Sequence, residues 1–569
     1  MAPEIFYESG NSPAVRLSQF FTEETRKKSG FAHCFSCAPS LDPLVTSIEY
    51  DSRNVKQGSL FFALPGLHTD GSVYIKDAIN RGASVIVHEN EISDNDKIED
   101  IVYLKTDNAR FAMSPISASY YGFPSQRLLV TGVTGTEGKS TTVYLIWQLL
   151  TMMGRKAGFI STVQHCMGKD VMWNPEHQTT PEAPVVQRLL RAMADNGCEY
   201  AVLEASSHGL SRRTNRLGDV NFYAGVLTNV THEHLEFHGT WEQYRDDKAN
   251  LFRALDNYAG NFVGGAAPQN EPFGVVNADD KSAHYFCAVT GRKILSYSPA
   301  GKEGDIILEA IESASDGSAY SAFIPVLNER LHLRDRLPGA FNAANVLAAL
   351  LAVSGLLNIP VKEIAPNVIN LKPVRGRMTS VNRGQPFEVV VDYAHTPSSF
   401  EAIFPPLRAR LDKSGGRIIS LFGSAGERDT QKRSEQGKIA GLYSDIIILT
   451  DEDPRGESSM DILKEIASGV FSASGGEVHC ALCNEVPRRK VFKQSDPSAD
   501  GEPYAGENLF LIPDRPQAIR KAFSLAKGND LVILLGKGHE NSIIYKDHVM
   551  PFDEITETEK ALAEIGYIK

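Results

Sequence analysis

Cysteine, tryptophan and long apolar runs are all scarce in this chain of 569 residues. No apolar run is long enough to cross a bilayer, which argues against membrane insertion. The amino terminus (Met-Ala-Pro-Glu-Ile) lacks the basic and apolar regions of a secretion signal. We therefore expect a cytoplasmic protein.

Seven cysteines are too few to form a disulfide framework in a chain of this length. Cys34 and Cys37 form one Cys-x-x-Cys pair, and Cys480 and Cys483 form another, each with an adjacent histidine. A zinc site built from both pairs would have to join distant parts of the chain. The simpler interpretation is reduced thiols in loops.

Positive charge is in the minority, because 58 lysines and arginines face 70 aspartates and glutamates and the net charge is −12. This balance argues against a nucleic-acid partner. A hydrophobic content of 42% and a charged content of 22% are ordinary for a soluble globular protein.

The most informative stretch is Val130–Thr142, which reads Val-Thr-Gly-Val-Thr-Gly-Thr-Glu-Gly-Lys-Ser-Thr-Thr. It closes an apolar strand and opens a helical pattern, the arrangement that cradles nucleotide phosphates. Glycines allow the backbone N–H groups to approach an anion closely. We expect Lys139 to reach the terminal phosphates and Ser140 to hold Mg²⁺. The spacing from Gly135 to Gly138 is more compact than in the general pattern, and it favours nucleotide binding over a merely structural turn.

Length predicts three or four domains, and the pattern along the chain indicates three of the α/β class. We place an N-terminal α/β domain at 1–126, a central parallel-sheet domain with the phosphate loop at 127–337, and a Rossmann-like domain at 338–569. Near-continuous apolar strands support the third domain, as expected for a parallel sheet covered on both faces. These strands are 388–392, 417–422, 445–450 and 530–535.

Polar residues suited to metal binding follow two strands of the central domain. Glu204 ends the strand 200–204, and a carboxylate beside a phosphate loop is a natural Mg²⁺ ligand. The next strand leads into a loop that contains His232, His234 and His238. Zinc is conceivable there, although Mg²⁺ with ATP suits the phosphate loop better. For His232 and His238, capping or packing is an equal alternative.

Lys248 lies in the helical pattern 241–252, on the same general face as Tyr244 and Leu251. Taken alone, this is a lysine whose stem packs while its ammonium snorkels to water.

Ten ordered motifs resemble the Mur ligase family across nearly the whole chain. The details are similar to the branch that adds an amino acid to UDP-N-acetylmuramoyl-L-alanyl-D-glutamate (the MurE type). The motifs are Asp51-Ser-Arg53 with Gly58–Gly66, Gly135–Thr141, Thr179-Thr-Pro-Glu182, Glu204–His208, Thr228–His234, Gly339–Asn345, Asp392–Pro397, Gly423–Asp429, Glu452-Asp-Pro-Arg455 and Gly536-Lys-Gly-His-Glu540.

The resemblance implies an ATP- and Mg²⁺-dependent synthesis of an amide through an acyl phosphate. It reverses the interpretation of Lys248, because the matching lysine of the family is carbamylated by CO₂ and binds metal. The implied catalytic residues are Lys139, Glu204, His234 and Lys248. The implied metal ligands are Ser140, Glu204, His234 and the Lys248 carbamate. The implied ATP contacts are Gly135, Thr136, Gly138, Lys139, Ser140, Thr141, Asn345 for adenine and Asp392 for ribose. Since Asn345 and Asp392 lie beyond the central domain, the third domain is expected to close over ATP.

The remaining implied partners are small molecules, and we expect a monomer. The first domain resembles a UDP-binding module. The residues implied for the UDP-sugar-peptide are Ser52, Arg53, Thr179, Thr180, Ser207 and Arg216, where the longer segment 211–216 leaves the choice of arginine open. The residues implied for the incoming amino acid are Arg428, Glu452, Asp453, Arg455, Gly536 and Glu540.

The amino acid that is added can be meso-diaminopimelate, L-lysine or L-ornithine. Arg455 matches the arginine of the usual diaminopimelate signature, and a guanidinium can grip the extra carboxylate. Asp453 replaces the usual Asn of that signature, and an ionised carboxylate would repel another. Either Asp453 shifts the preference toward lysine or ornithine, or it pairs with Arg455. We expect meso-diaminopimelate.

Two further alternatives remain. The first is another enzyme of the superfamily, such as a folylpolyglutamate synthetase or the ligase that adds D-Ala-D-Ala; the loops at 392–397 and 536–540 argue against both. The second is a non-catalytic nucleotide-binding regulatory protein, which would have no need to keep Lys139, Ser140 and Glu204.

Overall fold

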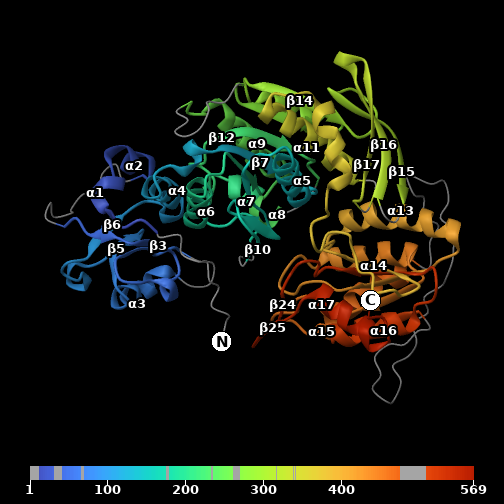
Figure 1. The fold of residues 1–569 in the computed structure, drawn as a ribbon. Coiled ribbons are helices and arrows are strands. Elements are labelled where there is room, and N and C mark those ends of the chain that lie inside the picture. The colour runs from blue at the N-terminus through green and yellow to red at the C-terminus, as the bar shows by residue number, and fades with distance from the viewer. Residues whose placement is uncertain are drawn as a thin grey trace. The chain divides into compact units, whose positions relative to one another are not determined.

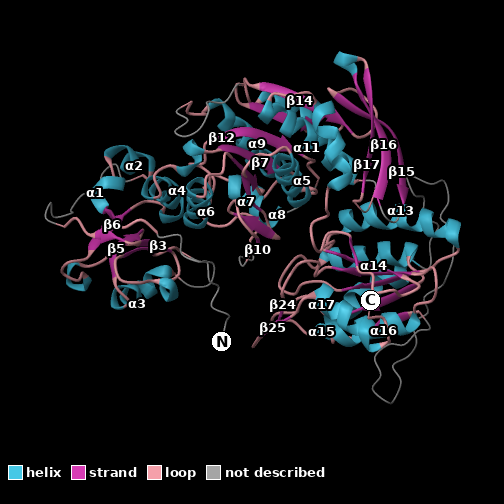
Figure 2. Cartoon of the chain, viewed as in Figure 1, coloured by secondary structure: helices cyan, strands magenta, loops and turns pink. Residues whose placement is uncertain are grey.

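The structure is a computed structural model that describes residues 12–30, 41–65, 70–174, 178–231, 235–260, 270–314, 317–337, 339, 341–473 and 508–568, without the side chains of 235–236 and 313–314. The chain divides into two compact units. The first contains Met1–Glu312, Ala319–Asp335 and Phe341–Leu371, and the second contains Lys372–Lys569 with Ser313–Ser318 and Arg336–Ala340. Figure 1 and Figure 2 show the elements of both units.

The first unit begins with a four-stranded parallel sheet in the order β3 (Ser47–Glu49), β4 (Ser59–Phe62), β5 (Ala83–His88), β6 (Val102–Lys105). Alternate residues of β4 point to opposite faces. Leu60 and Phe62 join the core with α4 (Ala109–Tyr120), and Phe61 joins the core with α3 (Ile75–Asn80). Both faces of this sheet are therefore covered.

A second sheet of the first unit has eleven strands. Its parallel centre runs β8 (Ala157–Ile160), β11 (Tyr200–Glu204), β7 (Leu129–Thr134), β12 (Phe222–Leu227), β13 (Phe273–Asn277), β14 (Lys293–Ser298), β15 (Ile306–Ala314). The antiparallel strands β9 (Gln164–Cys166) and β10 (Val171–Trp173) extend one edge, and β16 (Gly317–Ile324) and β17 (Glu329–Asp335) extend the other. The carboxyl ends of β7, β11 and β12 meet at one edge, where parallel sheets bind ligands.

Helices cover this sheet. Residues of α6 (Ala183–Asp195) and α9 (Trp241–Asp256) share one core cluster with the strands. The helix α5 (Lys139–Met152) packs against α11 (Asn342–Leu357), which also contacts β13 and β14. Short elements complete the unit: β1 (Val15–Arg16), β2 (Leu44–Val45), α1 (Leu17–Phe20), α2 (Glu23–Lys28), α7 (Ser207–Leu210), α8 (Leu235–His238), α10 (Ala283–Ala288) and α12 (Val361–Ile364).

The position of α11 differs from the sequence-based expectation, which assigned residues from 338 onward to the third domain. The helix is buried along most of its length because its small and apolar residues pack on α5 and the central sheet. Residues through Leu371 consequently belong to the first unit. In the described part of the chain no single helix is long and apolar enough to cross a membrane; α11 followed by Val361–Asn370 meets that length and composition only as a pair bent by 109°.

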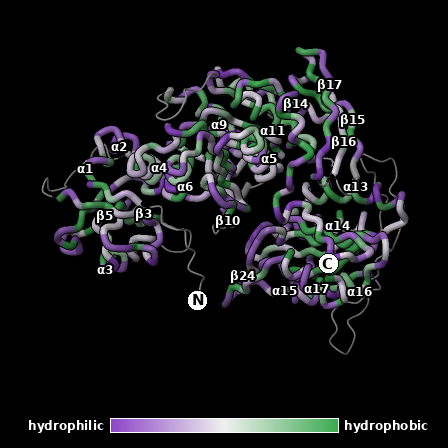
Figure 3. Tube along the Cα trace, viewed as in Figure 1, coloured by the Kyte–Doolittle hydropathy of each residue, from purple (hydrophilic) through white to green (hydrophobic). Residues whose placement is uncertain are grey.

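The second unit contains a six-stranded sheet in the order β18 (Thr379–Ser380), β19 (Glu388–Asp392), β23 (Leu531–Leu535), β20 (Ile418–Phe422), β21 (Ile446–Leu449), β22 (Leu509–Leu511). All neighbours are parallel except β18 and β19. The four strands predicted for this part of the chain are confirmed to within one residue at each end. Figure 3 shows the hydropathy of the residues along the chain.

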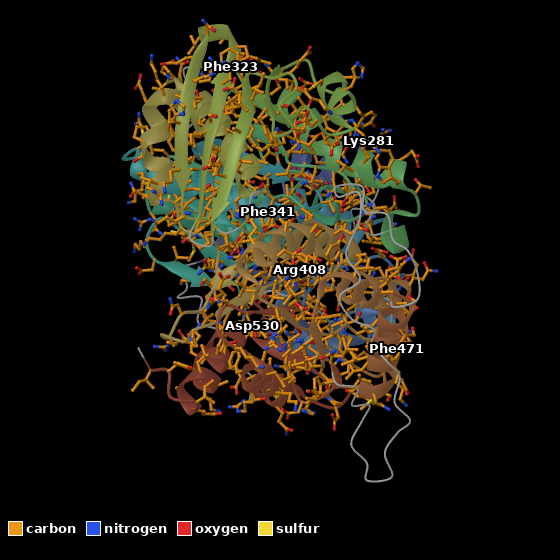
Figure 4. The ribbon with its side chains drawn as sticks, turned by 90° about the vertical axis from the view of Figure 1, so that its right-hand side faces the viewer. Lys281, Phe323, Phe341, Arg408, Phe471 and Asp530 are labelled. Carbon is orange, nitrogen blue, oxygen red and sulfur yellow. The ribbon has the colours of Figure 1, made fainter. Side chains whose placement is uncertain are left out.

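Two helical layers cover this sheet. One contains α13 (Pro397–Ser414), α14 (Gln431–Tyr443) and α15 (Ser459–Ala473), and the other contains α16 (Arg515–Leu525) and α17 (Glu554–Glu564). A hairpin of β24 (Ser542–Ile544) and β25 (Val549–Pro551) follows β23. Ion pairs hold the amino ends of the strands: the buried Arg408 Nη1 lies 2.7 Å from Asp445 Oδ2, and Nη2 of the half-buried Arg417 lies 2.6 Å from Asp530 Oδ2. Arg408 and Asp530 are labelled in Figure 4.

Candidate active site

The phosphate loop connects β7 to α5 at a tight turn. Gly135 has φ +149° and Gly138 has φ +82°, a region that favours glycine. A Cβ atom on Gly135 would lie 1.9 Å from Thr228 Oγ1, and one on Gly138 would lie 2.5 Å from Asn345 Oδ1. Backbone conformation and space therefore both favour glycine at the two positions. The predicted strand, turn and helix are present, and α5 begins at Lys139.

The loop is held by contacts on both sides. Lys139 Nζ donates to the carbonyl oxygen of Thr136 at 2.7 Å, within the loop itself. Thr136 Oγ1 accepts from the backbone N–H of Thr231 at 2.9 Å and lies 3.1 Å from Tyr244 Oη. The half-buried Thr141 is the third residue of α5. These contacts hold the backbone of the loop in place, and the Lys139 ammonium lies against the loop itself.

Asn345 lies against the same loop. Its Oδ1 accepts from Thr142 Oγ1 at 3.2 Å, and its Nδ2 donates to Asn342 Oδ1 at 2.9 Å. The expectation that Asn345 arrives with a separate closing domain is wrong, because α11 is part of the first unit. Its place beside Gly138 is compatible with the predicted nucleotide contact.

A carboxylate and two hydroxyls gather beside α5. Glu204, at the end of β11, is buried, and its Oε2 accepts from Ser140 Oγ at 2.8 Å. The same oxygen accepts from the backbone N–H of Thr162 at 2.8 Å and from its hydroxyl at 2.9 Å. Hydroxyl and carboxylate oxygens are the ligands that Mg²⁺ takes, so this donor set fits the ion. Sequence reasoning named Ser140 and Glu204 but missed Thr162.

Lys248 is fully buried and does not snorkel. Its Nζ donates to the carbonyl oxygen of Gly135 at 2.6 Å and lies 4.4 Å from the centre of the Tyr244 ring. Lys248 therefore lies on the buried face of α9 and contacts the phosphate loop. His232 and His234 lie outside the described residues, as do both Cys-x-x-Cys pairs. Among the described residues no three His, Cys, Asp or Glu side chains form a group that could hold a metal.

His238 serves a structural network. Its Nδ1 lies 2.7 Å from Asp247 Oδ2, and its Nε2 lies 3.0 Å from Ser207 Oγ. The His238 side chain is fully buried, so both ring nitrogens are used to join α7, α8 and α9. His238 and Asp247 also border a cavity of about 480 Å³ whose walls include Arg212 and Arg213. Ser207, which is expected to contact substrate, belongs to this network, and its contact with substrate stays a prediction.

Thr180 is the centre of a second cluster beside Glu204. Its hydroxyl donates to the Glu204 carbonyl oxygen at 2.9 Å and accepts from the backbone N–H of Ser206 at 3.0 Å. Arg216 donates to the Thr180 carbonyl oxygen at 2.8 Å and to Glu182 Oε1 at 3.0 Å. The structure therefore brings Arg216 to the half-buried Thr179 and to Thr180, with Ser206 as an additional member that sequence reasoning missed.

Ser52 and Arg53 lie in a short 3₁₀ turn after β3. Ser52 is buried, whereas the Arg53 side chain is 82% exposed and its Nη2 lies 2.5 Å from Asp51 Oδ2. The hydrogen bond from Arg53 holds the pKa of Asp51 below its usual value. No hydrogen bond among the described residues joins this turn to the Thr180 cluster.

In the second unit, the loops that follow β21 and β23 form one group. Lys537 Nζ donates to Asp453 Oδ1 at 2.8 Å and to Glu540 Oε2 at 2.5 Å. Asp453 thus pairs with Lys537, which sequence reasoning did not single out, and not with Arg455. The backbone N–H of Gly426 donates to the Asp453 carbonyl oxygen at 2.8 Å, which ties the loop of the exposed Arg428 to the group.

Two buried polar atoms of this group have no hydrogen-bond partner in the described part of the chain: Glu452 Oε2 and Arg455 Nε. A Cβ atom on Gly536 would lie 2.9 Å from Glu452 Oε2, and its φ of +100° lies in the region that favours glycine. These two atoms can therefore accept and donate hydrogen bonds to a ligand. A carboxylate and a guanidinium together suit an ammonium and a carboxylate.

Asp392 ends β19 and belongs to the second unit. Its Oδ1 accepts from the Ala394 N–H at 2.7 Å, and its Oδ2 accepts from the Met378 N–H at 2.6 Å. Burial raises the pKa of this carboxyl group. The Asp392 carboxylate thus fixes the backbone at Met378 and at Ala394 by hydrogen bonds. The predicted ribose contact would be an additional role.

A fully buried arginine, Arg515, anchors the loops that follow β21 and β23. Arg515, in α16, donates to the carbonyl oxygens of Asp451 at 3.0 Å and Leu535 at 2.8 Å, one from each loop-bearing strand end. Its Nε lies 2.8 Å from Glu554 Oε2, and both side chains are completely buried. No sequence motif identified this anchor.

The parallel sheet, the phosphate loop and the adjoining carboxylate define a nucleotide-binding enzyme of the phosphate-loop class. Three family models match the chain: "Mur ligase family, catalytic domain" at residues 44–118, "Mur ligase middle domain" at 133–353 and "Mur ligase, glutamate ligase domain" at 376–538. The chain belongs to the Mur ligase family, and it is an ATP-dependent ligase of the amide-forming type.

Relatives of known name agree with this assignment. A UDP-N-acetylmuramyl-tripeptide synthetase of Treponema denticola is 48% identical over 93% of this chain and 95% of its own length. A UDP-N-acetylmuramoyl-L-alanyl-D-glutamate–2,6-diaminopimelate ligase of Clostridium tetani is 32% identical over 90% and 93%. A solved structure of a ligase with that same name, at 24% identity and covering 92% and 95%, superposes with a TM-score of 0.55 and shows the shared fold.

Proposed function

We propose that this enzyme adds meso-diaminopimelate to the D-glutamate carboxylate of UDP-N-acetylmuramoyl-L-alanyl-D-glutamate, in the synthesis of peptidoglycan. The observation that carries the proposal is the pair of unpartnered atoms, Glu452 Oε2 and Arg455 Nε, beside the Gly536–Glu540 loop. The names of the relatives from Treponema denticola and Clostridium tetani support the sugar-peptide substrate. L-Lysine and L-ornithine are the alternatives for the amino acid.

The first half of the reaction joins two anions. An oxygen of the D-glutamate carboxylate attacks the γ-phosphorus of ATP, ADP leaves, and an acyl phosphate forms. Lys139 and the N–H groups of the loop that ends at Gly138 offset the negative charge. Ser140, Glu204 and a carbamate on Lys248, with His234, would hold Mg²⁺, which neutralises phosphate charge when bound.

In the second half, the amine of the incoming amino acid attacks the acyl carbon. A tetrahedral intermediate collapses to the amide, and inorganic phosphate leaves with the former carboxylate oxygen. Glu452 would orient the ammonium end of the amino acid, and Arg455 would orient a carboxylate. Thr179, Thr180 and Arg216 would hold the sugar-peptide near Glu204, and Ser52 and Arg53 the UDP portion.

The test is phosphate release with UDP-muramoyl dipeptide and ATP, offering meso-diaminopimelate, lysine and ornithine separately. We expect turnover to require the dipeptide and to be fastest with meso-diaminopimelate. Faster turnover with lysine or ornithine would assign one of those instead, and no turnover with any of them would refute the proposed sugar-peptide substrate.

The Arg455→Ala variant tests the amino-acid contact. Loss of a charge-assisted hydrogen bond is expected to raise the KM for the amino acid by about 10- to 100-fold. The KM for ATP is expected to stay within about twofold. Steady-state kinetics with each substrate varied in turn measures both constants.

Arg410→Ala is the matched control for that variant, because Arg410 pairs with Glu388 at the amino end of β19, opposite the loops. It should change neither constant. Equal effects of Arg455→Ala on the two KM values would place Arg455 outside the amino-acid pocket.

A further inference from the structure

The backbone of Glu137 in the phosphate loop is held by the segment 228–231, which follows β12. Thr228 Oγ1 donates to the Glu137 carbonyl oxygen at 2.6 Å, and Asn229 Nδ2 donates to the same oxygen at 3.2 Å. Asn229 Oδ1 accepts from the Glu137 N–H at 2.9 Å. The Asn229 amide therefore pairs with both backbone polar groups of Glu137, as a neighbouring strand would.

These side-chain contacts are additional to the pairing of the strands. β7 and β12 pair up to Thr134 and Leu227, so Thr228 and Asn229 lie past the last paired residue. The Thr228 hydroxyl also lies 3.3 Å from the Thr134 carbonyl oxygen, but its single hydrogen serves the shorter contact to Glu137. The Thr228 hydroxyl and the Asn229 amide therefore act on the conformation of the phosphate loop.

The direction of the Gly138 N–H follows from the contacts of Glu137. A trans peptide places its carbonyl oxygen and its N–H on opposite sides. Because the Glu137 carbonyl oxygen faces Thr228 and Asn229, the N–H of Gly138 faces away from them. In the part of the chain that the structure describes, no residue accepts a hydrogen bond from this N–H. Gly138 directly precedes α5, at the positive end of a 14-residue helix, where an anion can bind.

Asp280 supports the segment 228–231 from the loop that follows β13. Its Oδ2 accepts from the Val230 N–H at 2.8 Å, and its Oδ1 accepts from the Ser282 N–H at 2.8 Å, so the carboxylate joins two loops. Asn277, at the end of β13, donates from Nδ2 to the Thr228 carbonyl oxygen at 2.9 Å. The segment is thus bonded both to the phosphate loop and to the loop after β13.

We propose that Thr228, Asn229 and Asp280 are positioning residues for the nucleotide. Thr228 and Asn229 turn the Glu137 carbonyl oxygen away from the phosphates of ATP, so that the next N–H of the loop faces them. Asp280 holds the segment in place. Without these side chains the peptide can rotate and present a carbonyl oxygen to the phosphates, which repels them. The inference rests on the ATP dependence of the ligase, and it does not depend on which amino acid is added.

The test is calorimetric titration of the full chain with β,γ-imido-ATP, a non-hydrolysable analogue of ATP, in excess Mg²⁺. T228V replaces the hydroxyl by a methyl group of similar size, and it should raise the Kd about 2- to 10-fold. T228V/N229A removes both side-chain contacts and should raise the Kd about 10- to 100-fold, as expected for the loss of a hydrogen bond to a charged group. T228S keeps the hydroxyl and should bind as the wild type does. An unchanged Kd of T228V/N229A would overturn the proposal.

T131V is the matched control for T228V. Thr131 is a fully buried threonine of β7, and its Oγ1 has no hydrogen-bond partner among the residues that the structure describes. T131V should therefore leave the Kd unchanged. Thermal melting of each variant separates positioning from stability. A lower melting temperature of T228V/N229A with an unchanged Kd would show a purely structural role, against the proposal.

D280A tests the supporting contact, and it decides the question if the Thr228 variants do not fold. Its Kd for the analogue and its KM for ATP should rise about 2- to 10-fold, while the KM for the amino acid stays within about twofold. D279A is its control, because Asp279 accepts from Ser298 and Ala300 in another loop. An unchanged Kd of folded D280A would overturn the proposal. Absence of turnover by the wild-type enzyme with any amino acid would instead count against the proposed function, since the titration needs no turnover.

Discussion

Lys248→Ala is expected to lower kcat by about 10²- to 10³-fold, the cost typical of removing one preorganised electrostatic group from a site. Small carboxylic acids added to the buffer are expected to restore part of this activity. The physical reason is position: Lys248 is buried, and its Nζ lies 2.6 Å from the Gly135 carbonyl oxygen of the phosphate loop. As a carbamate, this side chain would supply an anionic oxygen to Mg²⁺, and a diffusible carboxylate can replace that oxygen in the space left by truncation.

The measurement is the turnover rate of Lys248→Ala with and without acetate or formate. Lys281→Ala is the matched control, because Lys281 is an exposed lysine of the same unit (Figure 4), and its activity should equal that of the wild type. Full activity of Lys248→Ala would eliminate the metal-binding role. Loss of activity without rescue would argue for an ammonium at this position in place of a carbamate.

Arg515→Met is expected to destabilise the second unit by about 3–5 kcal/mol, the cost of breaking a buried ion pair by removing one partner. Glu554 would be left buried without its cation, and the carbonyl oxygens of Asp451 and Leu535 would lose their donors. Burial already raises the pKa of Glu554. Because its protonated form is favoured in the folded state, the deficit should be smaller near pH 5 and should grow as the pH rises.

Urea unfolding of the full chain measures this effect in two signals. All three tryptophans, Trp147, Trp173 and Trp241, belong to the first unit, so their fluorescence reports on that unit. Circular dichroism reports on both units. We expect Arg515→Met to shift an early transition in circular dichroism and to leave the tryptophan transition in place.

Arg520→Met, in the same helix, is the control for Arg515→Met. Its ion pairs with Glu557 and Glu564 are partly exposed, so it should cost less than about 1 kcal/mol. A cost for Arg515→Met as small as that of Arg520→Met would contradict the anchoring role.

Local patterns predicted the elements well. The apolar runs at 388–392 and 530–535 are strands, and the Gly-rich turn before Lys139 joins a strand to a helix. Both features depend on residues that are close in sequence. Ser140 and Glu204 were also predicted to lie together, because parallel strands place their carboxyl ends at one edge of the sheet.

Contacts between distant residues could not be predicted in the same way. Ser207 bonds to His238 in preference to the Thr180 cluster, and Asp453 pairs with Lys537 in preference to Arg455. In the first case Ser206 and Ser207 are adjacent and have the same side chain, and in the second Lys537 is far from Asp453 in the sequence. The helix that carries Asn345 was assigned to the wrong unit because its apolar sequence fits either core, and only packing on α5 distinguishes them.

The central claim is that the enzyme makes its amide through an acyl phosphate on the D-glutamate carboxylate. The most direct measurement is mass analysis of both products after a reaction in which that carboxylate of the UDP-muramoyl dipeptide carries ¹⁸O. The account predicts a UDP-muramoyl tripeptide and inorganic phosphate that contains one ¹⁸O atom. Phosphate without label, or phosphate release without tripeptide, would contradict it.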